Sequence, residues 1–125
     1  MAKQIKVLIV EDEEIISKAL ATKLGKNKFN ITLAMDGATG LELAKKEMPD
    51  IVLLDLIMPK MSGFEVLEKI KKDPATNKIP VVILSNLDDS SYLKKGIEAG
   101  AAEYMVKTRT NLEEIIAKIH EIVKV

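Results

Sequence analysis

Five short runs of apolar residues recur along the chain, each rich in β-branched residues or leucine, and segments with helical spacing separate them. The runs are KVLIV (6–10), NITLAM (30–35), DIVLLDL (50–56), PVVILS (80–85) and EYMVK (103–107). The first, third and fourth are apolar at successive positions instead of alternating, which is typical of strands buried on both faces. Strands that alternate with helices predict a parallel sheet covered by helices on both sides and joined by right-handed crossovers. The pattern therefore predicts a three-layer α/β fold.

The segments between the runs carry apolar stripes that we expect to pack on this sheet. In chain order the stripes are Ile16, Ala19, Leu20 and Leu24; Leu41, Ala44 and Met48; Phe64, Leu67 and Ile70; Leu93 and Ile97; and Leu112, Ile115, Ile116, Ile119 and Val123.

The bulk composition narrows the class of protein. A chain of 125 residues fits one domain, and because no linker is evident we expect a single unit over 1–125, with its core at about 6–123. Nineteen basic residues balance nineteen acidic ones, so no nucleic acid or anionic membrane is indicated as a partner. The absence of cysteine excludes disulfides and thiolate sites. Since no apolar segment approaches the roughly 18 residues of a membrane span, we expect a soluble, cytoplasmic protein.

Polar residues follow four of the predicted strands: Glu11 and Asp12 after the first, Asp55 after the third, Ser85 after the fourth and Lys107 after the fifth. In an open α/β sheet, ligands bind beyond the carboxyl ends of the strands, so these side chains are expected at one edge. Two carboxylates about 4 Å apart repel by roughly 4 kcal/mol at an effective dielectric constant near 20. A divalent cation would relieve that repulsion, and an all-oxygen site favours Mg²⁺. The alternative for the acids at 11–14 is that they cap the next helix.

These residues resemble those of a known family. The acidic pair, the aspartate in the stretch D-x-x-M-P-x-M-x-G at 55–63, the serine that closes VVILS and the lysine that closes AAEYMVK are similar to the receiver domains of two-component response regulators. The resemblance covers nearly the whole chain. It implies a flavodoxin-like, doubly wound (βα)5 fold with strand order 2-1-3-4-5.

The resemblance also implies a role for each site residue. Asp55 would accept a phosphoryl group from a phosphohistidine, and Mg²⁺ would be held by Asp12 and Asp55, by Glu11 through a water molecule, and by the backbone carbonyl of Ile57. Ser85 and Lys107 would bind phosphoryl oxygens. Tyr104 would swing between exposed and buried positions as Ser85 moves.

The chain departs from the commonest pattern of that family in three places. The first acid is Glu11 where aspartate is more usual. Thr108 follows Lys107 where proline with a cis peptide is frequent, and because a non-proline cis bond costs about 2.5–4 kcal/mol we expect a trans bond. Ile57 and Leu87 occupy positions whose side chains affect the hydrolytic water. Neither can hydrogen-bond that water, so a long-lived phosphoryl state is expected.

Three alternatives remain open from the residues. A flavin carrier would need a phosphate-binding loop after the first strand, but EDEE stands there, and the chain has just two Phe, two Tyr and no Trp. An aspartate-dependent phosphatase would usually carry a second aspartate at position 57, which is Ile. A pseudo-receiver would share the fold without being phosphorylated.

The receiver interpretation predicts a signalling domain that assists its own phosphorylation and dephosphorylation, rather than a turnover enzyme. Its partners would be a sensor histidine kinase or phosphotransfer protein and an unknown downstream protein, with no direct contact to nucleic acid. The expected contact surface comprises the fourth helix, fifth strand and fifth helix, near Leu93, Ile97, Tyr104 and Arg109. We expect a monomer or a weak, phosphorylation-dependent dimer.

Overall fold

The computed structural model describes residues 4–124, so the ends of the predicted unit, residues 1–3 and 125, lie outside the described residues. Five parallel strands form one sheet in the order β2-β1-β3-β4-β5. They are β1 (Lys6–Val10), β2 (Asn30–Ala34), β3 (Ile51–Leu54), β4 (Val81–Ser85) and β5 (Glu103–Val106). The predicted fold class and strand order are confirmed.

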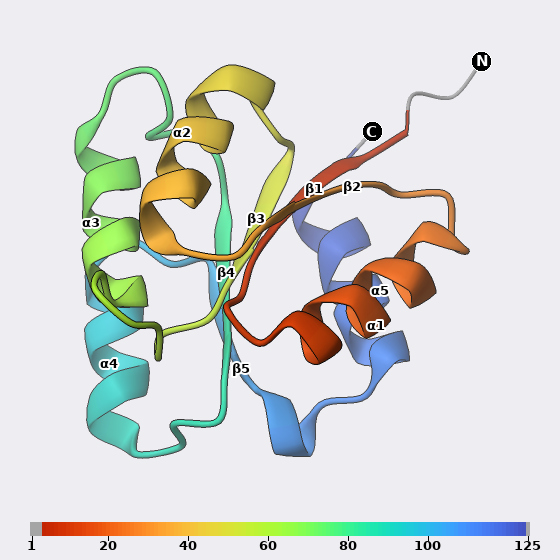
Figure 1. The fold of residues 1–125 in the computed structure, drawn as a ribbon. Coiled ribbons are helices and arrows are strands. Elements are labelled where there is room, and N and C mark those ends of the chain that lie inside the picture. Colours follow the sequence, from red (N-terminus) through yellow and green to blue (C-terminus); the bar gives the residue numbers. More distant parts are fainter. Residues whose placement is uncertain (1–3, 125) are drawn as a thin grey trace.

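Helices cover both faces of the sheet, as Figure 1 shows. The helices are α1 (Glu14–Gly25), α2 (Gly37–Glu47), α3 (Gly63–Lys72), α4 (Ser90–Glu98) and α5 (Leu112–Ile122), and a short 3₁₀ helix, η1, spans Lys107–Arg109. In this view α2, α3 and α4 lie on one side of the sheet, and α1 and α5 lie on the other. The molecule thus has the three predicted layers.

The central strands are buried because both of their faces are covered. In β3, Val52 and Leu54 point into the core under α2, α3 and α4, whereas Ile51 and Leu53 point into the core under α1 and α5. All four side chains are buried. Alternation of side chains across a strand explains why an unbroken apolar run is needed here.

Three of the predicted helical stripes were partly wrong. In α1 the residues facing the sheet are Ser17, Leu20 and Leu24, while Ile16 is 38% exposed and Ala19 lies on the solvent side. Met48 is 50% exposed because α2 ends there in a left-handed conformation, with φ of 47°. Ile97 is 49% exposed, since α4 turns Gly96 towards the core instead.

Local capping explains several helix boundaries. Asp36, Ser62 and Asp89 accept hydrogen bonds from backbone N–H groups in the first turns of α2, α3 and α4, and Asn111 forms a capping box with Glu114 at α5. As predicted for Thr108, the described backbone contains no cis peptide bond. Within residues 4–124, no helix combines the length and apolar character needed to cross a membrane.

Candidate functional site

The acidic cluster, comprising Glu11, Asp12 and Asp55, lies at the carboxyl edge of the sheet. Strands β1 and β3 are direct neighbours, and Val10 pairs with Leu54, so the next residues, Glu11 and Asp55, lie side by side. One carboxylate oxygen from each of the three acids lies within 4.8 Å of the others. Glu11 and Asp55 are buried and Asp12 is half-buried. The predicted convergence of these residues is confirmed.

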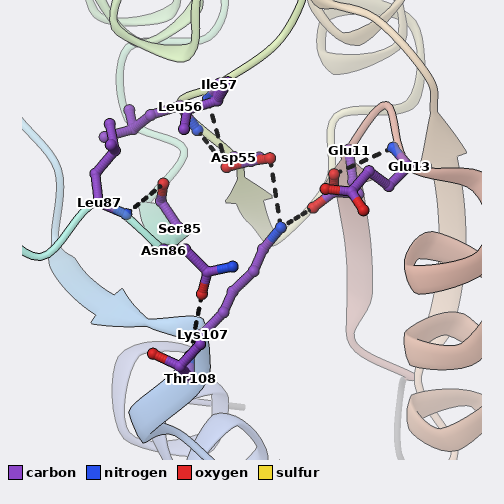
Figure 2. Close-up of polar contacts among 10 residues, drawn as sticks. All are labelled: Glu11, Glu13, Asp55, Leu56, Ile57, Ser85, Asn86, Leu87, Lys107 and Thr108. Carbon is purple, nitrogen blue, oxygen red and sulfur yellow. Dashed lines mark hydrogen bonds and ion pairs between the residues drawn. The ribbon is translucent and has the colours of Figure 1, made fainter.

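The two oxygens of Asp55 have different surroundings, as Figure 2 shows. Oδ1 accepts hydrogen bonds from the backbone N–H groups of Leu56, at 2.8 Å, and Ile57, at 3.4 Å. Oδ2 faces the Nζ of Lys107, at 3.4 Å. The backbone bonds orient the carboxylate, so that Oδ2 is directed towards the cation and the cluster.

Lys107 reaches the cluster from the end of the edge strand β5. It begins η1 immediately after β5, and β4 lies between β5 and the strand that carries Asp55. Its Nζ contacts Glu11 Oε2 as well as Asp55 Oδ2. The lysine side chain is only 15% exposed, so it provides a largely buried positive charge beside two buried carboxylates. The closer contact with Glu11 was not predicted from the sequence.

Burial and charge shift the pKa values of this ion pair. Burial raises the pKa of Glu11, and the neighbouring charge of Asp55 raises it further, while the bond to Lys107 opposes the shift. For Lys107, burial alone would lower the pKa, but the bond to Glu11 and the charges of Asp55 and Glu11 outweigh it and raise the pKa. Lys107 therefore stays charged at neutral pH.

The acids after β1 do not cap α1 in the usual way. Glu13 occupies the N-cap position, but its side chain makes no capping hydrogen bond. Instead the backbone N–H of Glu13 donates to Glu11 Oε1, at 3.2 Å, which holds the Glu11 side chain towards the cluster. The capping alternative therefore does not account for Glu11.

Ser85, Leu87 and Tyr104 form a second group next to the acidic cluster. Ser85 is fully buried at the end of β4, and its Oγ accepts a long hydrogen bond from the Leu87 N–H, at 3.4 Å. The Tyr104 hydroxyl donates to the Leu87 carbonyl, at 2.6 Å, and the ring is buried. Tyr104 thus has its inward orientation in this structure. Both residues contact the loop between β4 and α4.

Two residues of the site were missed by sequence reasoning. Asn86 lines a pocket of about 150 Å³ together with Asp12, Asp55 and Lys107, and its Oδ1 accepts from the Thr108 N–H at 3.2 Å. A single asparagine after a strand gives no distinct signal. Gly63 begins α3 against Asp55, and a Cβ on it would lie 2.1 Å from the Asp55 carbonyl oxygen. The glycine that ends the D-x-x-M-P-x-M-x-G stretch was a usable signal for that close approach.

Comparisons with known proteins identify the family of this chain. The family model of the response regulator receiver domain matches residues 7–120. The response regulator PleD of Caulobacter vibrioides is 41% identical over 102 residues, which make up 82% of this chain and 22% of PleD. ArlR of Staphylococcus aureus is 32% identical over 118 residues, or 94% of this chain and 52% of ArlR. The chain therefore spans about a fifth to a half of the length of these two relatives.

A solved structure shows the same fold over nearly the full chain. The receiver domain of the Francisella response regulator 1452 has a TM-score of 0.89 and 29% sequence identity, and the match covers 97% of this chain and 98% of that one. The family model spans most of the chain, and the match includes the strand ends that carry the acidic cluster and Lys107. The chain belongs to the response regulator receiver family and is a receiver domain of two-component signal transduction.

Proposed function

We propose that Asp55 accepts a phosphoryl group from a phosphohistidine of a sensor histidine kinase or phosphotransfer protein. The observation that carries this proposal is the convergence of three carboxylates within 4.8 Å, next to a buried lysine. Of the three acids, Asp55 accepts hydrogen bonds from two backbone N–H groups through Oδ1. Its other oxygen, Oδ2, would then be the nucleophile. A carboxylate is an adequate nucleophile for a phosphoryl group that is already activated on imidazole.

In the proposed reaction Asp55 Oδ2 forms a bond to phosphorus while the phosphorus–nitrogen bond to the imidazole breaks. The departing imidazole nitrogen keeps the bonding electron pair, and a proton from water completes the neutral ring. Phosphoryl transfer requires mainly positioning and neutralisation of charge on the phosphoryl oxygens. Lys107 Nζ would supply one positive charge for this purpose, and the Ser85 hydroxyl would donate to a phosphoryl oxygen after moving towards it.

The donor set fits Mg²⁺, because it consists of carboxylates and no histidine or cysteine lies among them. Asp12 and Asp55 would bind the ion directly, and the Ile57 carbonyl would add a backbone ligand. The bond between Glu11 and Lys107 supports an indirect role for Glu11, through a water molecule. Bound Mg²⁺ would supply further positive charge to the phosphoryl oxygens.

We also propose a slow loss of the phosphoryl group. Ile57 is 58% exposed and lines the pocket, and Leu87 is half-buried in the loop after β4. Neither side chain offers a hydrogen-bond donor or acceptor to orient an attacking water molecule.

The output would be a change in the surface formed by α4, β5 and α5, near Leu93, Ile97, Tyr104 and Arg109. Phosphorylation would draw Ser85 towards Asp55 and change the loop that holds Tyr104, which biases a two-state surface. We propose that residues 6–123 act as one switch unit in the cytoplasm. This unit would bind a downstream protein without contacting nucleic acid, and it would be a monomer or a weak, phosphorylation-dependent dimer.

Intact-mass measurement tests the proposal. After incubation with Mg²⁺ and acetyl phosphate, one added phosphoryl group is expected, and it should be absent when EDTA is present. Asp55→Asn should abolish it, whereas Asp89→Asn, which changes an exposed helix cap, should not. No added mass with acetyl phosphate or with a phosphorylated histidine donor would favour the pseudo-receiver instead.

A further inference from the structure

We propose that Gly96, a buried residue of α4, positions the Tyr104 ring by leaving the space in which the ring lies inward. This proposal rests on the proposed function only in assigning Tyr104 to the switch. The placement of the ring by Gly96 concerns the unphosphorylated protein and is tested there.

The Tyr104 ring packs against the backbone of α4 at Gly96. A Cβ built on Gly96 would lie 3.2 Å from Tyr104 Cδ2 and 3.7 Å from Cε2. It would also lie 2.6 Å from the Cδ1 of Ile83, which pairs with Tyr104 across β4 and β5. The ring and the Ile83 side chain together therefore occupy the volume that any side chain at position 96 would need.

Contacts at the other end of the ring hold it inward. The Tyr104 hydroxyl donates to the Leu87 carbonyl, at 2.6 Å, and the Leu87 N–H donates to Ser85 Oγ. Burial raises the pKa of the Tyr104 phenol, the nearby Ser85 hydroxyl opposes the shift, and the charge of Asp55 adds to it. The ring thus spans from the loop that carries Ser85 to the helix that forms the proposed output surface.

Helix geometry alone gives no reason for glycine at this position. Gly96 has no positive φ, and glycine inside a helix is about 0.5–1 kcal/mol less favourable than alanine. Gly25, at the end of α1, provides the contrast, because a Cβ there would meet nothing within 4 Å. The contact with the Tyr104 ring and Ile83 is the physical reason for glycine at 96.

Adding a Cβ at position 96 must displace one of these two neighbours. The closer contact is with Cδ1, the end of the Ile83 side chain, which is fully buried, whereas the Tyr104 ring must yield by a few tenths of an ångström. Tyr104 is also buried, at 8% exposure, but its ring can turn outwards about its Cα–Cβ bond once the hydrogen bond to Leu87 opens. Alanine at 96 should therefore increase the outward population of Tyr104 without any phosphorylation.

Tyrosine spectroscopy can measure this orientation directly. The chain has two tyrosines and no tryptophan, so Tyr92→Phe leaves Tyr104 as the only reporter. In that background, Gly96→Ala should raise iodide quenching of tyrosine fluorescence about two-fold or more, as the outward state gains population. Absorbance titration should show the phenol pKa falling towards its ordinary value of 10.0. Gly25→Ala, the matched control, should change neither quantity.

A second variant keeps the test decisive if Gly96→Ala folds poorly. Ile83→Val combined with Gly96→Ala removes the closest contact, at 2.6 Å, and keeps the tight contact with the ring. Urea unfolding monitors whether each variant is folded. Either variant, if folded and with the parent's quenching and phenol pKa, overturns the proposal. Both measurements use protein without a phosphodonor. They therefore test the role of Gly96 whether or not the protein accepts a phosphoryl group, and normal phosphorylation would not make up for unchanged quenching and phenol pKa.

Discussion

Asp55→Asn is expected to stabilise the protein when divalent ions are removed, although Asp55 is the proposed phosphoacceptor. The substitution keeps the shape of the side chain, and an amide oxygen can still accept from the Leu56 and Ile57 N–H groups. It removes one of three negative charges that the fold brings together. The unfolded chain does not hold Asp55 near Glu11 and Asp12, so the repulsion that Asp55 experiences acts on the folded state alone.

The separations set the magnitude. Two carboxylates no more than 4.8 Å from Asp55 each repel it by at least about 3.5 kcal/mol at an effective dielectric constant near 20. Lys107 Nζ, at 3.4 Å, attracts it by about 5 kcal/mol on the same basis. The net repulsion is about 2 kcal/mol, and solvent around the half-buried Asp12 reduces it. The free energy of unfolding should therefore rise by about 1–2 kcal/mol.

Urea unfolding followed by circular dichroism at pH 7, with EDTA and low salt, measures this change. Asp89→Asn is the matched control, because the exposed Asp89 caps α4 and asparagine caps equally well, so its effect should stay within about 0.5 kcal/mol. Added Mg²⁺ should stabilise the parent by about 2.7 kcal/mol at one hundred times its dissociation constant, and Asp55→Asn by less. A loss of stability in Asp55→Asn under EDTA would refute the claim that repulsion outweighs the attraction of Lys107.

Five further substitutions test other parts of the structure. Ser17→Ala should raise the free energy of unfolding by about 1 kcal/mol, because the buried Ser17 hydroxyl has no hydrogen-bond partner among the described residues. A lower free energy of unfolding, measured with urea, would contradict this. Gly63→Ala should lower the free energy of unfolding by about 3 kcal/mol, since the new Cβ meets backbone atoms that cannot rotate away. If it costs no more stability than Gly25→Ala, where a Cβ meets nothing within 4 Å, the steric argument is wrong. The pKa of Glu11 is raised, so its stabilising contribution is complete below the ordinary value of 4.5 and is lost as pH rises through the folded-state pKa. Under EDTA, the stability of the parent relative to Glu11→Gln should therefore fall above about pH 4.5, and a flat difference would count against the shift. Ile57→Asn and Leu87→Gln should each shorten the lifetime of phosphorylated Asp55, measured by intact mass. Unchanged lifetimes would show that these apolar side chains do not slow its hydrolysis.

Local patterns in the sequence predicted most of the fold. The unbroken apolar run at 51–54 indicated a strand covered on both faces, and β3 has that environment. Positions at strand ends were also predictable, because the carboxyl ends of parallel strands meet at one edge. Asp55 and Lys107 therefore meet although 52 residues separate them.

The helix faces were harder to predict, because a stripe of apolar residues can be shifted by one position. In α1, Ile16 suits the buried stripe by residue type, yet Ser17 is the residue that is turned inwards. The direction in which a helix faces depends on how it crosses the sheet, and that is a property of the packed layers rather than of the helix sequence.

The amino-acid sequence alone is enough to deduce the alternation of strands and helices, the two-sided burial of the central strands and the residue types at the strand ends. These follow from periodicity and from the order of elements along the chain. Two contacts that no local pattern encodes arise from packing: Lys107 contacts Glu11 across 96 residues, and the Tyr104 ring lies close to Gly96. Such contacts depend on distances of a few ångströms between distant segments, and the register and packing of the sheet and helices set those distances.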